Sequence, residues 1–246
     1  MKFNFWMSLL IFISPKVFAE KFQLDDKRWI NILIAEPAVS PKALLILFPG
    51  EKGLLSGRDK SDEFSNNFLI RSRHLFVKQG FKIIVLGESS WAKEGYDDKD
   101  RISSQHAEDV ADLIKIQNKQ SIPVYGIGTS RSTVSVAAIA IAKPNLFNGV
   151  VLTSTVSRNS IFQSLQLSDT KVSVLFLHHE LDGCPSSPIK LARAIYDSLK
   201  SKIKIEFKSL NGGANVSKNP CRAKTFHGFW QTEQLAVDTI ASWIGK

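Results

Sequence analysis

Hydrophobic residues along this chain gather in short apolar runs, and segments with helical spacing separate these runs. The runs at 44–48 and 172–177 are almost entirely apolar, which is typical of strands covered on both faces. Apolar runs that alternate with helical patterns indicate crossover connections and a mostly parallel sheet. The pattern predicts strands at 29–35, 43–48, 82–86, 124–127, 149–154, 172–178 and 202–208.

Helical spacing predicts helices between these strands, at 62–79, 103–119, 133–143, 188–200 and 229–244, with a short one at 159–165. The segment 133–143 is apolar on all sides, and Pro144 ends it, so we expect a buried helix. No Gly-, Pro- or Ser-rich linker divides the chain, which favours one domain over 20–246. The stretch between residues 130 and 182 has room for one strand and one short helix, so we expect no large lid.

The first 19 residues have the pattern of a secretory signal peptide. Lys2 precedes an apolar run at 5–13, which is too short to span a bilayer, and a small-residue site ends at Ala19. We expect cleavage after Ala19 and a secreted or periplasmic protein. The alternative is an uncleaved N-terminal anchor. No other segment has the length of apolar sequence that stable membrane insertion requires.

The chain is basic, with 32 Lys and Arg against 23 Asp and Glu and a formal net charge of +9. Removal of residues 1–19 takes away Lys2 and Lys16 and no acid, which leaves +7. The densest lysine cluster, at 200–208, alternates with apolar residues as in a strand with one wet face. A nucleic-acid site would need a basic patch with exposed aromatic residues, and this pattern is absent, so no nucleic-acid partner is expected.

Two cysteines, Cys184 and Cys221, are present. In a secreted chain one pair suggests one disulfide, and two unpaired thiols are the alternative. Two cysteines make a poor metal site, and the histidines do not have zinc-finger spacing. We therefore expect no metal and no cofactor.

The strongest local motif is Gly128-Thr129-Ser130-Arg131-Ser132, which follows an apolar strand and precedes the buried helix. This is the context of a nucleophile elbow, in which a tight turn exposes the serine hydroxyl at a helix N-terminus. We expect Ser130 to be the nucleophile and the backbone N–H of Arg131 to donate to the oxyanion. Ser132 stands where the G-x-S-x-G pattern has glycine, and a plain helix cap would carry the same string.

An acid and a base follow the elbow in the chain. Asp182 comes shortly after the predicted strand 172–178, where a carboxylate can orient a catalytic imidazole. Glu180 is the alternative acid, and a further interpretation is that both acids cap the next helix. His227 precedes the last predicted helix and completes the order Ser, acid, His. His106 is expected to sit at a helix start, where a capping role is favoured over lining the pocket.

The segment Pro49-Gly50-Glu51-Lys52-Gly53 follows an early strand. Glycines there let the backbone approach a substrate closely. We expect the N–H of Glu51 to be the second oxyanion donor, with that of Lys52 as the nearest alternative. A simple Pro-Gly turn is the other interpretation.

Taken together, the chain resembles the α/β-hydrolase superfamily, and more narrowly small secreted bacterial serine hydrolases of unassigned substrate. The resemblance lies in 67–73, in the Ser130 motif, and in Asp182-Gly183-Cys184 with Cys221 and His227. It implies an eight-stranded, mostly parallel sheet with helices on both faces. It also implies hydrolysis through an acyl-enzyme on Ser130, with His227 as base and Asp182 as the acid.

Carboxylic esters are the expected substrates, as small-molecule partners. A peptidase or amidase of the same fold is one alternative, and a non-catalytic binding protein that keeps the hydrolase fold is another. The sequence indicates neither the natural substrate nor the oligomeric state.

Overall fold

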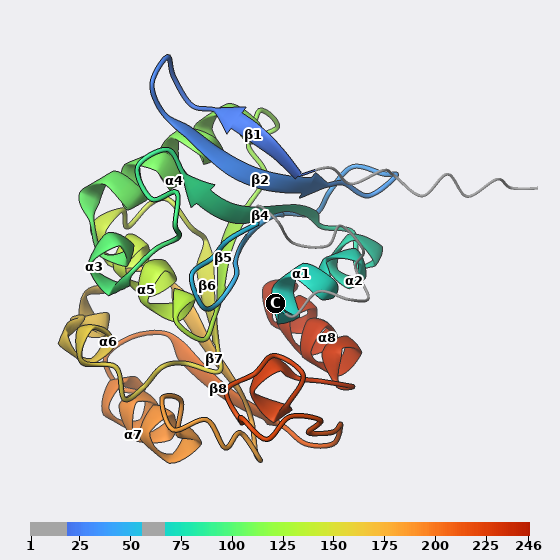
Figure 1. Cartoon of the computed structure of the whole chain (residues 1–246), viewed down its shortest axis with the longest axis vertical. Coiled ribbons are helices and arrows are strands. Elements are labelled where there is room, and N and C mark those ends of the chain that lie inside the picture. The colour runs from blue at the N-terminus through green and yellow to red at the C-terminus, as the bar shows by residue number, and fades with distance from the viewer. Residues whose placement is uncertain (1–18, 56–66) are drawn as a thin grey trace, which may run out of the picture.

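The computed structural model describes residues 19–55 and 67–246. Eight strands form one twisted sheet in the order β1-β2-β4-β3-β5-β6-β7-β8 (Figure 1). The first strand pairs antiparallel with the second, and the second pairs antiparallel with β4. All other neighbours are parallel. The strands are β1 Ala19–Gln23, β2 Trp29–Ala35, β3 Leu44–Phe48, β4 Lys82–Ser89, β5 Val124–Thr129, β6 Gly149–Thr153, β7 Ser173–His179 and β8 Ile205–Leu210.

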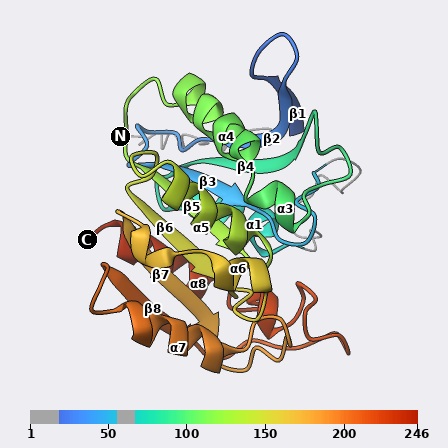
Figure 2. The ribbon, with the colours of Figure 1, turned by 90° about the vertical axis from the view of Figure 1, so that its left-hand side faces the viewer.

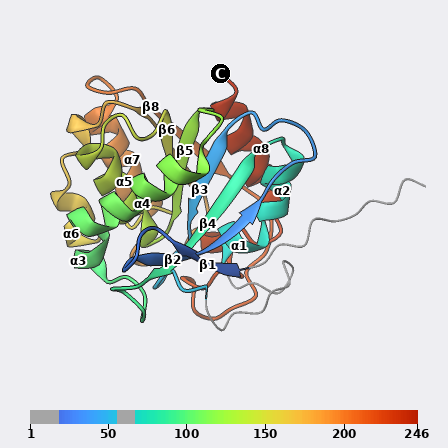
Figure 3. The same ribbon diagram turned by 90° about the horizontal axis from the view of Figure 1, so that it is seen from above.

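Helices cover both faces of the sheet, as Figures 2 and 3 show from two directions. One face carries α3 Asp98–Arg101, α4 Ser104–Gln117, α5 Ser132–Ala142, α6 Ser160–Ser164 and α7 Ile189–Leu199. The other carries α1 Phe68–Arg71, α2 Arg73–Lys78 and α8 Glu233–Ile244. Each layer encloses its own hydrophobic core, because alternate strand residues point to opposite faces. The predicted mostly parallel eight-stranded sheet with helices on both faces is confirmed.

The central strands are buried along their whole length. All five residues of β3 and all five of β6 are buried, as their unbroken apolar sequence predicts. Helix α5 is also enclosed, with nine of its residues buried. This rigid centre holds the ends of the strands, and the loops that follow them, in fixed positions at one edge of the sheet.

Several element bounds differ from those that the pattern predicts. The edge strand β1 is not among the predicted strands: Ala19 is the last residue of the predicted signal peptide, and no element is predicted over 20–28. The last strand lies at Ile205–Leu210 and not at 202–208, since 200–203 complete a turn after α7. The predicted helix 62–79 is two short helices with Ser72 between them, and its residues 62–66 lie outside the described part.

The predicted helix 229–244 begins late, at Glu233. The residues before it form a 3₁₀ turn, Phe226–Gly228, and then Phe229 and Gln231 adopt positive φ angles of 57° and 65°. These left-handed residues interrupt any helix that continues from His227. Over residues 19–55 and 67–246, no helix is long and apolar enough to cross a membrane. The expected signal peptide lies almost wholly outside these residues.

Candidate active site

Ser130 occupies a tight turn between β5 and α5. Its φ is 54°, in the left-handed region that non-glycine residues seldom adopt. The turn requires glycine nearby, because a Cβ at Gly128 would lie 2.6 Å from the carbonyl oxygen of Ser132. A Cβ at Gly50 would lie 3.2 Å from the Cβ of Ser130. Strand, strained serine and buried helix thus follow one another as the elbow motif predicts.

Three polar side chains from three strand ends meet at this turn. The Oγ of Ser130 lies 3.0 Å from the Nε2 of His227. The Nδ1 of the same ring lies 2.9 Å from the Oδ2 of Asp182. Because a carboxylate only accepts hydrogen bonds, the Nδ1 carries the proton and the Nε2 accepts from Ser130. The structure therefore brings together the three side chains that the sequence singles out as nucleophile, base and acid.

The carboxylate of Asp182 is shielded from solvent although the loop around it is largely exposed. The side chain of Asp182 is fully buried, and its Oδ1 accepts the backbone N–H of Cys184 at 2.9 Å. Glu180, the alternative acid, is exposed and accepts a hydrogen bond from the Ser209 hydroxyl at 3.3 Å. Asp182 is thus the carboxylate that reaches the imidazole.

The loop that carries His227 is tied to the body of the protein on several sides. The hydroxyl of Ser154 donates to the backbone oxygen of His227 at 2.7 Å. The buried Arg71 donates to the oxygen of Gly228 and pairs with Glu233 at 2.7 Å. Burial lowers the pKa of Arg71, although the pairing with Glu233 opposes this. These contacts fix the imidazole before any substrate binds.

A disulfide joins Cys184 to Cys221, as expected. Cys184 lies two residues beyond Asp182, and Cys221 lies six residues before His227. The bond therefore connects the loop of the acid to the segment that leads into the base. Free cysteines are absent from the part of the chain that the structure describes.

The two expected oxyanion donors lie beside Ser130. Arg131 is the N-cap residue of α5, so its N–H is at the positive end of the helix dipole. Glu51 lines the same hollow as Ser130 and His227, and its φ of 55° is again left-handed. Six described non-glycine residues have positive φ, and five of them lie at Ser130, in the 49–53 loop, at the end of β6 or in the segment after His227: Glu51, Ser130, Ser154, Phe229 and Gln231. Backbone strain is therefore concentrated at this edge of the sheet.

Comparison with known proteins agrees with this geometry at the level of the fold. No family model matches the chain, and no curated protein matches it in sequence. Solved structures match it at low identity. An α/β serine hydrolase homologue from Coxiella burnetii has a TM-score of 0.61 at 12% identity, covering 94% of this chain and 97% of its own.

Two further structures give the same result. Est1E from Butyrivibrio proteoclasticus, with ferulic acid bound, has a TM-score of 0.63 at 13% identity, covering 92% of this chain and 98% of its own. A serine hydrolase without a lid from Xanthomonas campestris has a TM-score of 0.59 at 10% identity, covering 92% and 95%. The chain has the α/β-hydrolase fold. At these identities the likeness establishes the fold and leaves the activity to be argued from the site.

The hollow that the described residues form over Ser130 is small, about 30 Å³. It is lined by residues from the 49–53 loop, the elbow, the start of α1 and the His227 loop, including Asn67 and Phe68. The sequence pattern assigns Asn67 and Phe68 no part in a site. Asn67 directly precedes an apolar run, as a helix N-cap does, and its side chain caps α1 by accepting the N–H of Leu69 at 3.0 Å.

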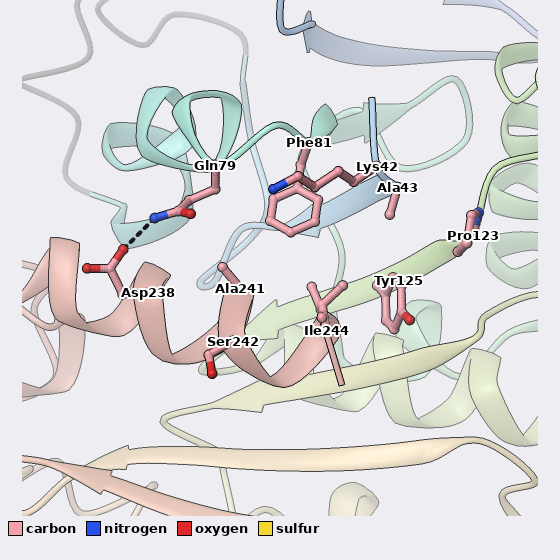
Figure 4. A pocket seen from close by; sticks show the side chains of 11 residues that line it. Lys42, Ala43, Gln79, Phe81, Pro123, Tyr125, Asp238, Ala241, Ser242 and Ile244 are labelled. Carbon is pink, nitrogen blue, oxygen red and sulfur yellow. Dashed lines mark hydrogen bonds between the residues drawn. The ribbon is translucent and has the colours of Figure 1, made fainter. Parts of the chain in front are cut away.

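A larger hollow of about 480 Å³ opens at the opposite edge of the sheet, where the parallel strands begin (Figure 4). Lys42, Phe81 and Pro123, which precede three strands, lie on its wall. On its other side Gln79 donates to Asp238 at 2.6 Å. None of the residues singled out for catalysis lines this hollow.

Arg101 is the residue that sequence analysis missed most clearly. Its side chain is almost completely buried (1% exposed). It contacts both the elbow helix and the 49–53 loop, with bonds to Ser132 at 2.8 Å and to the oxygen of Glu51 at 2.5 Å. It follows Asp98-Lys99-Asp100 in the sequence, and such a charged run is typical of a solvated turn. Nothing local in the pattern marks it as buried.

The expected capping role of His106 is wrong. Ser103 caps α4, and its hydroxyl accepts the backbone N–H of His106 at 3.2 Å. The imidazole is buried against the rings of Tyr96, Phe48 and Trp91, and neither ring nitrogen has a hydrogen-bond partner among the described residues. Burial, assisted by the charge of Arg101, lowers the pKa of His106 to about 3.

Proposed function

We propose that this protein is a serine hydrolase that cleaves carboxylic esters through an acyl-enzyme on Ser130. The observation that carries the proposal is the pair of contacts at 3.0 and 2.9 Å, from Ser130 through His227 to Asp182. The order of these residues along the chain is the one that α/β hydrolases use. The likeness to serine hydrolases and to Est1E supports the same class.

Catalysis then proceeds in two steps. His227 accepts the Ser130 proton on Nε2 while Oγ attacks the ester carbonyl carbon, and the imidazolium that forms is stabilised by Asp182. The carbonyl oxygen gains a negative charge, which the N–H groups of Arg131 and Glu51 stabilise. The imidazolium returns the proton to the leaving alkoxide, and the C–O bond breaks. Water, deprotonated by His227, releases the acid and restores the Ser130 hydroxyl.

The small hollow and the short connections within the 130–182 segment favour small or extended substrates. Between α5 and β7 the segment contains β6, α6 and a single 3₁₀ turn, Leu167–Asp169. A lid of the size that covers long acyl chains has no place in it. A peptidase of the same fold is the nearest alternative, and a matched pair of an acetyl ester and an acetyl anilide distinguishes the two by their kcat/KM.

A fluorophosphonate probe tests the proposal. The oxidised wild-type protein should be labelled, and Ser130→Ala should abolish the labelling completely because the nucleophilic oxygen is gone. Ser135→Ala, which removes another buried hydroxyl of the same region, is the control and should still be labelled. A folded wild-type protein that resists the probe, or labelling that survives in Ser130→Ala, would show that Ser130 is not a catalytic nucleophile.

A further inference from the structure

Three consecutive carbonyl oxygens of the 49–53 loop each accept a hydrogen bond. The oxygen of Pro49 accepts from the Ser132 hydroxyl. That of Gly50 accepts from the N–H of Gly53 at 3.1 Å. That of Glu51 accepts from Arg101 at 2.5 Å. The planes of three successive peptides are therefore fixed.

The middle peptide is the one that matters for the oxyanion. It joins Gly50 to Glu51, and its N–H is the expected second donor. In a trans peptide the N–H points away from the C=O, so the bond from Gly53 to the Gly50 oxygen sets the direction of the Glu51 N–H. The bonds on the flanking peptides prevent this plane from rotating. They also hold Glu51 in its left-handed conformation, which no local preference supports.

One buried network supplies both flanking bonds. Arg101 donates to the Ser132 hydroxyl at 2.8 Å and to that of Ser135 at 3.1 Å. The Ser132 hydroxyl accepts from Arg101 and donates its own hydrogen bond to the Pro49 oxygen. The departure from the glycine of the elbow motif thus provides a hydroxyl that glycine lacks. Ser132 is 1% exposed, so water cannot replace these bonds readily.

Arg101 also brings a positive charge to the site. It forms no ion pair with a carboxylate within the residues that the structure describes. Burial, together with the nearby charge of Arg131, lowers the pKa of Arg101 to about 10, which still leaves the guanidinium charged at neutral pH. A fixed cation beneath an oxyanion site favours the negative charge that develops there.

We infer that Arg101 and Ser132 are positioning residues, which hold the 49–53 loop so that the Glu51 amide is preorganised for the oxyanion on a substrate bound to Ser130. This inference rests on the proposed function, because it assigns a role within that reaction. Neither side chain touches the reacting atoms. Both act through the backbone of the loop.

The test compares Ser132→Ala with Ser135→Ala. The two serines are buried on α5, and both accept from Arg101, but only Ser132 donates to the loop. With a short chromogenic ester, Ser132→Ala should lower kcat by about 10- to 100-fold, less than the loss of a donor itself, and leave KM within about twofold. Ser135→Ala should lower kcat by less than about threefold. The affinity of a boronic acid, whose adduct resembles the tetrahedral intermediate, should fall in parallel with kcat.

Arg101→Met and Arg101→Lys provide the second arm. Arg101→Met should lower kcat by about 100-fold, and the lysine variant should recover part of this, because it keeps the charge and one donor. Thermal unfolding of each variant checks folding. If Arg101→Met does not fold, the comparison of kcat between Ser132→Ala and Ser135→Ala still tests the inference. Equal kcat values in wild type and Ser132→Ala, equal losses in the two serine variants, or a change confined to KM would overturn the inference.

These outcomes are separable from failure of the proposed function. If the wild type reacts with the fluorophosphonate and Ser130→Ala does not, the hydrolase proposal stands whatever the positioning variants do. If the wild type does not react, both proposals fall together.

Discussion

The sheet has one edge where its parallel strands begin and one where they end. The side chains at these two edges differ in a way that the volumes of the hollows do not reveal. The edge where the parallel strands begin has the larger hollow, about 480 Å³, with an ordinary contact between Gln79 and Asp238. At the edge where the strands end, the hollow that the described residues form over Ser130 is much smaller, about 30 Å³. That edge nevertheless collects a serine, a histidine and an aspartate in hydrogen-bonding distance, together with a buried arginine and a disulfide.

The difference teaches that a candidate site is better recognised by convergent polar groups than by empty space. In open parallel sheets the loops after the carboxyl ends of the strands come from many parts of the chain and meet at one edge. At the other edge, short connections leave a hollow between helix and strand ends without assembling chemistry. Variants at each edge measure how far this distinction holds.

The largest effect is expected from Asp182, the proposed acid at the edge where the parallel strands end. In Asp182→Asn, the amide can present an N–H to the imidazole and favour the wrong tautomer, so kcat should fall by about 10⁴-fold. Glu180→Gln is the matched control, since Glu180 is exposed on the same loop, and its kcat should stay within about twofold of wild type. Comparable losses in the two variants, measured with the chromogenic ester, would contradict the assignment of the acid.

The disulfide should affect stability more than chemistry. The cysteines are 37 residues apart, and a loop of this length corresponds to about 4 kcal/mol in the chain-entropy model. A Cys184→Ser, Cys221→Ser variant should unfold at lower urea concentration by about that free energy. Reduction of the wild type should have the same effect and leave the double variant unchanged. A variant as stable as wild type would show that the bond acts little on the unfolded chain.

Low pH should lower the free energy of unfolding through the buried histidines His106 and His178. Burial lowers the pKa of His106 to about 3 and that of His178 to about 4, whereas in the unfolded chain both are near 6.5. Between these values the unfolded chain binds more protons, so the free energy of unfolding falls as the pH falls below about 6.5.

His106→Phe isolates one of these contributions. Phenylalanine suits the surrounding rings and cannot be protonated, so the pH dependence of unfolding should become shallower by up to about 1.4 kcal/mol per pH unit. Urea unfolding at pH 7 and pH 5 should then show wild type losing about 2 kcal/mol more than the variant. Parallel losses in the two proteins would mean that His106 is charged in the folded state or neutral in both states.

The smallest effect is expected at the opposite edge. Asp238→Ala removes the carboxylate that accepts from Gln79 next to the larger hollow (Figure 4) and from Gln234 on the same helix. Stability should fall by about 1 kcal/mol, because the bonds of a partly exposed side chain are largely replaced by bonds to water, while kcat/KM stays within about twofold. A substantial loss of activity in this folded variant would break the comparison between the two edges.

The fold was predictable because its central strands have to be apolar. The runs that became β3 and β7 were recognisable since both faces of each strand are covered, and Pro144 marked the end of the α5 region. The shorter or more polar elements were less accessible. β1 lies where the targeting pattern dominates, and the left-handed Phe229 delays α8 for reasons of tertiary packing, such as its burial beside Phe68.

The candidate site was predictable to the extent that catalysis needs particular residue types at strand ends. Ser130, Asp182 and His227 lie in loops that follow strands, and the structure places Ser130 and Asp182 each within hydrogen-bonding distance of the His227 imidazole. Arg101 could not be found, because its burial depends on a long-range contact with α5 and the 49–53 loop. The choice between Asp182 and Glu180 also required the three-dimensional course of the loop after β7.

The cluster of left-handed residues has a consequence for engineering. Glycine at position 51 or 154 would adopt the same backbone conformation more easily than the present side chains do. Such substitutions could relieve strain in the folded chain, but they would also let the loops explore other shapes. Stabilising substitutions should therefore be sought in the outer helices. In the loops around Ser130, a substitution that relieves backbone strain also makes the loop more flexible.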